Sequence, residues 1–180
     1  MYQFIIKSFK LIFLGFLPLL CISSIDSDQS VVNDFVEDNW LRVVANDTIQ
    51  ELEGNMSFEH TSENFKDGQY FNSLKLRLKS DSGKVPNDVE FTISKENKIA
   101  RLPVGHYRVN PIDGFINHFD GVFGVANINS MGERPFFAAD GTIHITKMEE
   151  NNVAGRMNMT LSNGDGSSIK IVGKFEAEVL

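Results

Sequence analysis

The stretch Ile169-Lys-Ile-Val-Gly-Lys-Phe-Glu-Ala-Glu-Val179 decides the fold class of this chain. Apolar or small residues occupy every second position, and Lys or Glu occupies most of the positions between them. Successive side chains of a β-strand point to opposite faces, so this segment predicts a strand with one buried face and one solvent face. We expect it to be a central or closing strand of its sheet. Its inward residues should be Ile169, Ile171, Phe175, Ala177 and Val179.

The same alternation recurs in the segments 56–60, 74–79, 89–94, 142–146 and 157–161. Strands with one solvent face are typical of antiparallel sheets. Asp-Gly pairs at 67–68, 113–114, 120–121, 140–141 and 165–166 predict tight turns between strands. Residues 121–126 are expected to form a fully buried strand. The chain is therefore predicted to be all-β, as an antiparallel β-sandwich or an open barrel.

The composition is that of one globular domain. The chain has 180 residues, of which 42% are hydrophobic and 23% charged, and its formal charge is −7. This acidic balance argues against a nucleic-acid-binding protein, which needs a basic surface to neutralise phosphates.

The N-terminus has the layout of a secretory signal. Lys7 and Lys10 precede an uncharged apolar run that ends at Ile22, and small residues follow. We expect residues 1–23 to be removed and the protein to be periplasmic or secreted, with an uncleaved N-terminal anchor as the alternative. Cys21 is either an apolar residue of the removed segment or the lipidated residue of a bacterial lipoprotein, attached to the cell envelope. Membrane contact is expected only through such a lipid or anchor.

Two further segments follow the signal. Residues 24–52 are expected to form an N-terminal segment with a short helix, because Ser30 can cap a helix that places Val31, Phe35 and Trp40 on one face. The change to a period of two after Leu52 predicts an antiparallel β domain over residues 53–180.

The last eighty residues carry a resemblance. Its motifs are Leu102-Pro-Val-Gly-His-Tyr107, Gly141-Thr-Ile-His-Ile-Thr-Lys-Met148, Val153-Ala-Gly-Arg-Met157 and Ile169-Lys-Ile-Val-Gly-Lys-Phe-Glu-Ala177. Residues 100–180 resemble the C-terminal module of small exported bacterial β-sandwich proteins of unknown function, many of which are envelope lipoproteins. The resemblance implies no catalytic residues.

Catalytic and metal motifs are lacking in the sequence. It contains no nucleophile elbow, no phosphate-binding glycine loop and no zinc-binding helix motif, and no two of the four histidines lie within four residues. The loop 163–168 lacks the closing acid of a calcium loop and predicts a hairpin. We therefore expect no catalytic residue, metal or cofactor. The enzymatic alternative is a hydrolase that gathers its site from separate hairpins, with His106, His118, Asp120 or Asp140.

Phenylalanines concentrate between residues 115 and 137. Phe115, Phe119, Phe123, Phe136 and Phe137 either fill the core or line an apolar binding site. The candidate ligand-binding residues are Tyr107, His118, Phe119, Phe123 and Arg134, with His118 and Arg134 as anchors for an acidic or hydroxylated head group.

The sequence thus predicts a non-enzymatic secreted or cell-envelope β-sandwich module. Its partner would be an envelope protein, a glycan or a small apolar ligand. A lipocalin-like carrier of a small apolar ligand and the His/Asp hydrolase are the two alternative functions.

Overall fold

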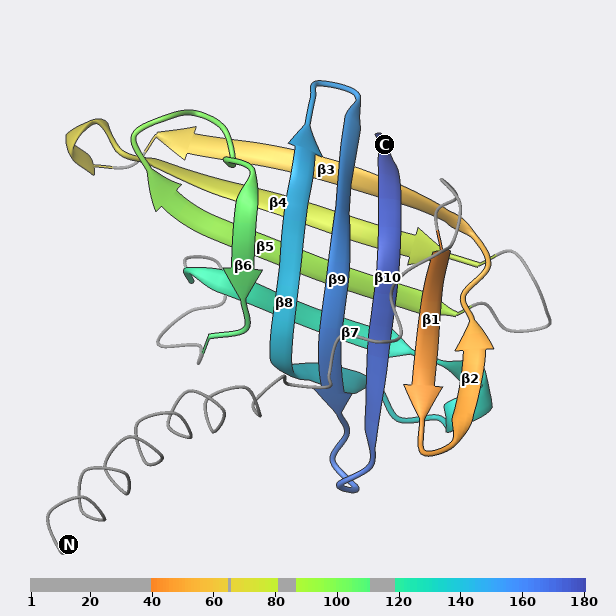
Figure 1. The fold of residues 1–180 in the computed structure, drawn as a ribbon. Coiled ribbons are helices and arrows are strands. Elements are labelled where there is room, and N and C mark those ends of the chain that lie inside the picture. Colours follow the sequence, from red (N-terminus) through yellow and green to blue (C-terminus); the bar gives the residue numbers. More distant parts are fainter. Residues whose placement is uncertain (1–39, 65, 81–86, 111–118) are drawn as a thin grey trace, which may run out of the picture. The chain divides into compact units, whose positions relative to one another are not determined.

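The computed structural model describes residues 40–64, 66–80, 87–110 and 119–180, and the described part of the chain is all-β (Figure 1). Its ten strands are β1 (Trp40–Ala45), β2 (Thr48–Glu51), β3 (Asn55–Asn64), β4 (Tyr70–Lys79), β5 (Asp88–Asn97), β6 (Gly105–Arg108), β7 (Gly121–Asn127), β8 (Phe136–Met148), β9 (Asn152–Ser162) and β10 (Ser168–Val179). Two single turns of 3-10 helix, Lys66–Gly68 and Asn129–Met131, lie between strands. The predicted all-β class is confirmed.

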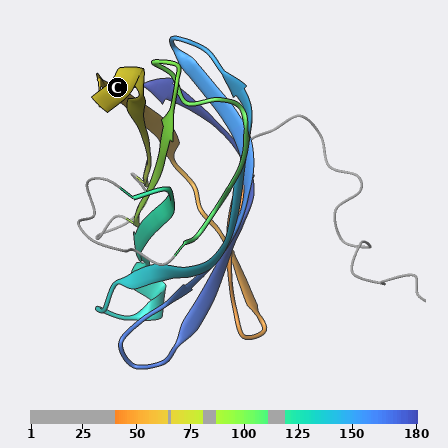
Figure 2. The same ribbon diagram turned by 90° about the vertical axis from the view of Figure 1, so that its left-hand side faces the viewer.

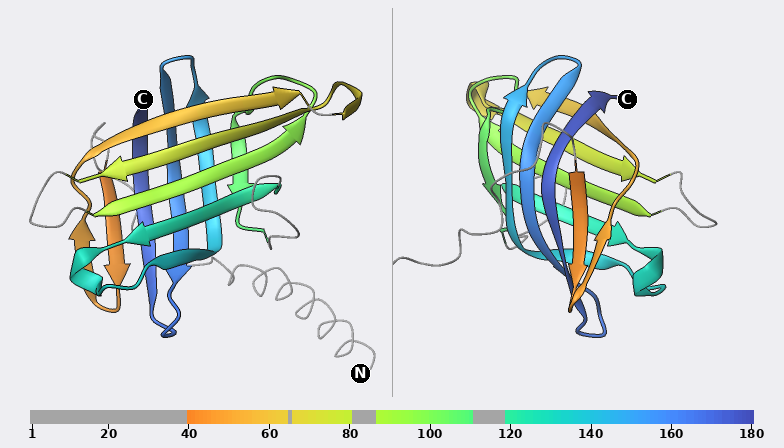
Figure 3. Two further views of the ribbon diagram at one scale, coloured as in Figure 1. Left: turned by 180° about the vertical axis from the view of Figure 1, so that it is seen from behind. Right: turned by 45° about the vertical axis from the view of Figure 1, so that its right-hand side comes forward.

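The strands form two layers that face each other. One layer has the order β3-β4-β5-β7, and the other has the order β2-β1-β10-β9-β8-β6. The strands of one layer cross those of the other at a steep angle, which is plain from in front and from behind (Figures 1 and 3). Seen edge-on, the two layers enclose the core between them (Figure 2).

Both pairs of layer edges are joined, so the sheet closes on itself. At one corner β7 pairs with the start of β8, through Val125 with Phe137 and Ala126 with Phe136. At the other corner the end of β10 pairs with β3, and this pair is parallel. The strands β10-β3-β4-β5-β7-β8-β9 therefore make a closed barrel of seven strands. The expectations of an open barrel and of purely antiparallel pairing are corrected, because pairs between distant strands close the sheet.

Strand β10 changes partner along one edge, and this creates a fork. Its first half pairs with β1, from Val44 opposite Lys170 to Trp40 opposite Lys174. Its last residues pair with β3, through Glu178 opposite Ser57. Between Lys174 and Glu178, no strand of the described chain is in register with this edge of β10.

The core fills the space between the layers. Ile169, Ile171, Phe175 and Ala177 of β10 point inward and are at most 3% exposed, as predicted, and β10 does close the barrel. Val179 was expected to join them, but it is 51% exposed, because it lies in the short pair with β3 at the end of the strand.

Strand β7 is buried on only one of its two faces. Val122 and Ala126 are at most 1% exposed, whereas Phe123 and Val125 between them are partly exposed on the outer face. The expectation of a strand buried on both faces is therefore wrong, because the outer face of this layer has no other layer against it in the described chain.

The Asp-Gly pairs have two different roles. Those at 67–68 and 165–166 lie in the β3–β4 and β9–β10 turns, the pair at 120–121 lies at the start of β7, and the pair at 113–114 lies outside the described residues. The pair at 140–141 lies inside β8 at an irregularity of its pairing with β9, so the turn expected there is wrong. Gly141 has a φ of 124°, and a Cβ would lie 2.3 Å from the Asn158 carbonyl oxygen, so only glycine suits this close strand pair.

The predicted N-terminal helix is not supported. Trp40 begins strand β1, and residues 40–51 form the β1–β2 hairpin, which pairs with β10. The rest of the segment expected to be helical lies outside the described residues, as do the signal segment and Cys21. No helix among the residues that the structure describes has the length and apolar character needed to span a membrane.

Candidate functional site

Tyr107 is a buried tyrosine whose hydroxyl is bonded to the loop that precedes its own strand. It lies in β6, is 4% exposed, and donates a hydrogen bond from its hydroxyl to the Pro103 carbonyl oxygen. Burial, and secondarily the negative charge of Asp120, raises the pKa of Tyr107 to about 12. The phenol is thus a neutral donor at ordinary pH and holds the β5–β6 loop against the barrel.

The predicted aromatic residues do not share one environment. Phe119 and Phe136 are buried, Phe123 lies partly exposed on the outer face of β7, and Phe137 is 48% exposed. Phe115 lies outside the described residues.

The two predicted polar anchors are also separate. Arg134 forms a 2.5 Å ion pair with Asp165 in the β9–β10 turn, and His118 lies outside the described residues. Among the described members of the predicted ligand site, no hydrogen bond or ion pair joins one to another. That site stays a prediction.

A pair of histidines lies on the outer face of the second layer, which is the layer β2-β1-β10-β9-β8-β6. His106 of β6 and His144 of β8 are directly opposite in register, and their rings stack with centroids 3.8 Å apart. Asp140 is on the same face of β8, two side-chain positions further along. The hydrolase alternative, which would draw its site from His106, His118, Asp120 or Asp140, stays a hypothesis. Over the described ranges, no three His, Cys, Asp or Glu side chains are grouped closely enough to hold a metal ion.

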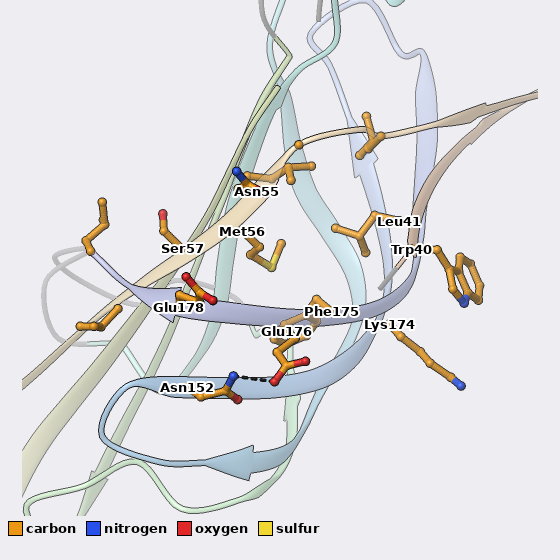
Figure 4. A pocket seen from close by; sticks show the side chains of 15 residues that line it. Trp40, Leu41, Asn55, Met56, Ser57, Asn152, Lys174, Phe175, Glu176 and Glu178 are labelled. Carbon is orange, nitrogen blue, oxygen red and sulfur yellow. Dashed lines mark hydrogen bonds between the residues drawn. The ribbon is translucent and has the colours of Figure 1, made fainter. Parts of the chain in front are cut away.

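A pocket of about 680 Å³ opens at the fork of β10 (Figure 4). Its size falls in the range of small-molecule sites, which are typically about 300–1,000 Å³. It lies between the start of β1, the start of β3 and the end of β10, where the change of strand partner leaves the edge of β10 open. Buried apolar side chains line its inner part: Leu41, Leu52, Met56, Leu78 and Phe175.

Polar side chains surround the opening of this pocket. Glu176, Glu178 and Lys174 line it from β10, where they alternate with the inward residues of that strand. The Nδ2 of Asn152 donates to the Glu176 carboxylate at 2.5 Å (Figure 4), whereas the buried Asn152 Oδ1 has no hydrogen-bond partner among the described residues. Asn55 and Ser57 line the opposite side, from β3. The pocket therefore combines an apolar floor with hydrogen-bonding groups at its mouth.

Comparison of the chain with protein-family models, with curated proteins and with solved structures finds no match in any of the three. The resemblance of residues 100–180 to exported bacterial β-sandwich proteins therefore stays a prediction. The structure defines the class of protein as a closed, seven-stranded β-barrel with an additional hairpin, β1–β2, and an additional strand, β6, that pairs with β8.

Sequence reasoning missed the pocket and the histidine pair. The pocket needs the change of partner along β10, which brings residues 41, 56 and 175 together. For the histidines, the alternation placed His144 on the polar face of its strand, but its partner depends on the β6–β8 register.

Proposed function

We propose that this protein is a non-enzymatic, exported binding module that takes a small amphipathic molecule into the pocket at the fork of β10. The observation that carries the proposal is the pocket itself, which has an apolar floor and a polar mouth. Leu41, Met56 and Phe175 offer the floor to an apolar tail. Few polar groups are needed to orient such a ligand.

The charges at the mouth favour a particular head group. Glu176 and Glu178 contribute two carboxylates and Lys174 one ammonium, so the mouth is acidic. A head group with hydroxyls or an amine can donate hydrogen bonds to the carboxylates of Glu176 and Glu178.

The barrel interior supports a scaffold role rather than the lipocalin-like alternative. A ligand between the layers would have to displace fully buried side chains, such as Phe91, Leu76 and Ile143. Replacing tightly packed core groups is costly, because protein interiors are packed as densely as organic crystals.

The pocket is tested with N-phenyl-1-naphthylamine, an uncharged amphipathic amine whose fluorescence rises in apolar surroundings. We expect saturable binding to the wild-type protein. Asn55→Trp, at an exposed position on the pocket wall, should weaken binding at least tenfold by filling the opening. Asn127→Trp is the matched control at an exposed position at the end of β7 and should change binding less than twofold.

Two results would contradict the pocket assignment. One is the absence of saturable binding by a wild-type protein whose unfolding transition is intact. The other is a Kd that Asn55→Trp leaves unchanged while that variant keeps the wild-type melting temperature.

Export is tested separately from binding. We expect N-terminal sequencing of the protein from its native host to start after residue 23, or at a lipid-modified Cys21 that Cys21→Ser abolishes. An intact Met1 on the protein in the cytoplasm would contradict this part of the proposal.

A further inference from the structure

Strand register places five side chains in one line across the outer face of the second layer. Each is directly opposite the next on the neighbouring strand, from β6 through β8, β9 and β10 to β1. This outer row consists of His106, His144, Arg156, Lys174 and Trp40. Neighbouring strands are about 4.8 Å apart, so four steps span about 19 Å.

The adjacent row of the same face adds to the positive charge. It runs from Arg108 through Thr142, Asn158 and Val172 to Arg42. Arg42 is neutralised by Glu51, with 3.0 Å between guanidinium and carboxylate. Arg108 and Arg156 are exposed, and within the described chain neither they nor Lys174 form an ion pair.

This excess of positive charge contrasts with the outer face of the other layer of the barrel, β3-β4-β5-β7. There, Arg77 and Lys75 both pair with Glu90, and the acidic residues Glu59 and Asp88 lie directly opposite Lys75 and Lys79 in register, so the charges on that outer face are compensated. Three uncompensated cations in two adjacent rows stand out in a chain whose formal charge is −7. Such a localised field attracts an anionic partner despite the acidic balance of the whole chain.

The positive charge is confined to a narrow strip. On one side of it, Asp140 and Lys170 lie in the next row with opposite charges, and on the other side Lys147 pairs with Glu149 while Glu176 adds a negative charge. A planar membrane surface would meet these balanced or acidic rows as well as the strip. A linear chain that follows the strip would meet its cations alone.

The chemistry of the row distinguishes between linear polyanions. Guanidinium, ammonium and indole N–H groups are donors without acceptor capacity, which suits carboxylate or sulfate oxygens. The rings offer a poor platform for bases: His106 and His144 stack on each other, and the Arg42 guanidinium lies 4.9 Å from the centre of the Trp40 ring. Single-stranded nucleic acids depend on open aromatic faces for stacking.

We propose that the outer row binds a linear anionic polysaccharide, with carboxylate or sulfate groups along the chain contacting Arg156, Arg108 and Lys174. The histidine pair and Trp40 flank these cations at the two ends of the row. This inference is independent of the pocket function, although Lys174 and Trp40 border both sites.

Calorimetric titration with two defined probes tests the inference. The probes are a heparin octasaccharide, which carries sulfate, and an octagalacturonate, which carries carboxylate alone. We expect at least one to bind and maltooctaose, a neutral oligosaccharide, not to bind. Arg108→Gln/Arg156→Gln should weaken binding at least tenfold. Lys79→Gln/Lys98→Gln removes the same charge at exposed positions outside this face, at the end of β4 and just after β5, and should change binding less than twofold.

The outcomes separate the row from the pocket and from other polyanions. Asn55→Trp should leave oligosaccharide binding unchanged, and Arg108→Gln/Arg156→Gln should leave naphthylamine binding unchanged. No binding of either anionic octasaccharide would overturn the inference, as would equal losses in the two double variants. Tighter binding of oligothymidylate or of phosphatidylglycerol vesicles than of both octasaccharides would also overturn it.

Discussion

Truncation of Phe175 tests the face assignment of β10, on which the barrel depends. The ring is 3% exposed, and opposite it on β9 lies Gly155, which has no side chain to fill a void. A hypothetical Cβ on Gly155 would lie 2.8 Å from the ring, so the ring packs directly on the neighbouring backbone. Because backbone does not move easily, the surroundings would fill little of the void left by Phe175→Ala.

The expected cost follows from the buried area. An aromatic side chain buries about 150–250 Å², which at about 25 cal/mol per Å² is worth about 4–6 kcal/mol as an upper bound. Measured Phe→Ala changes in cores cost about 3–5 kcal/mol, and we expect this range. Glu176→Ala, one residue on, removes an exposed carboxylate and its hydrogen bond from Asn152, and should cost at most about 1 kcal/mol.

Urea unfolding provides the measurement. Trp40 is the only tryptophan of the chain and lies opposite Lys174, so its fluorescence reports on the strand pair beside Phe175. The midpoints should fall in the order wild type, Glu176→Ala, Phe175→Ala, with an unchanged slope in urea. Equal losses, or a larger loss for Glu176→Ala, would refute the assignment, because a one-residue slip exchanges the two faces of a strand.

Three further changes probe the barrel elsewhere. Burial, and secondarily the charge of Arg101, lowers the pKa of His60 below 6.5. The unfolded chain then binds the proton more readily than the folded chain, so the free energy of unfolding should fall as the pH drops below about 6.5. His60→Gln should flatten this pH dependence in urea titrations at pH 5–7.5, and an unchanged pH dependence would contradict the assignment. Tyr107→Phe leaves the Pro103 carbonyl without its donor and should cost about 1–3 kcal/mol. Because the folded pKa of Tyr107 is about 12 and the ordinary value is 10.0, wild-type stability should also fall between pH 10 and 12, and persistence of that fall in Tyr107→Phe would count against the cause. Gly173 has a φ of 154°, and Gly173→Ala would place a Cβ 2.0 Å from the Trp40 carbonyl oxygen. The substitution should therefore shift the Trp40 fluorescence and lower the free energy of unfolding by about 1–3 kcal/mol or more. A wild-type spectrum and a wild-type urea midpoint would refute this.

Local patterns in the sequence were sufficient for the strands. Residues 56–60, 74–79, 89–94, 142–146, 157–161 and 169–179 alternate, and all lie in strands. Alternation works because the period of a strand is two whatever its partner, so one strand reveals its own buried face. The same reasoning correctly placed Phe175 inside.

Local patterns failed where a distant contact decides. Trp40 follows a helical spacing, yet it pairs with Lys174 in a strand, because tertiary pairing outweighs local preference. Val179 continues the alternation of β10 but lies at the short parallel pair with β3, where the layer ends. The pair at 140–141 has the chemistry of a turn, but a close neighbouring strand uses its glycine instead.

In the candidate sites, too, some features follow from local sequence and others only from contacts between distant strands. The sequence by itself determined that His144 and Lys174 belong to polar faces of their strands, because each is flanked by inward residues. Only the tertiary structure decided that these side chains stand in one row, since register between strands depends on pairing along their whole length. The pocket likewise exists because β10 exchanges β1 for β3 along one edge, and no local pattern encodes such an exchange between segments more than a hundred residues apart.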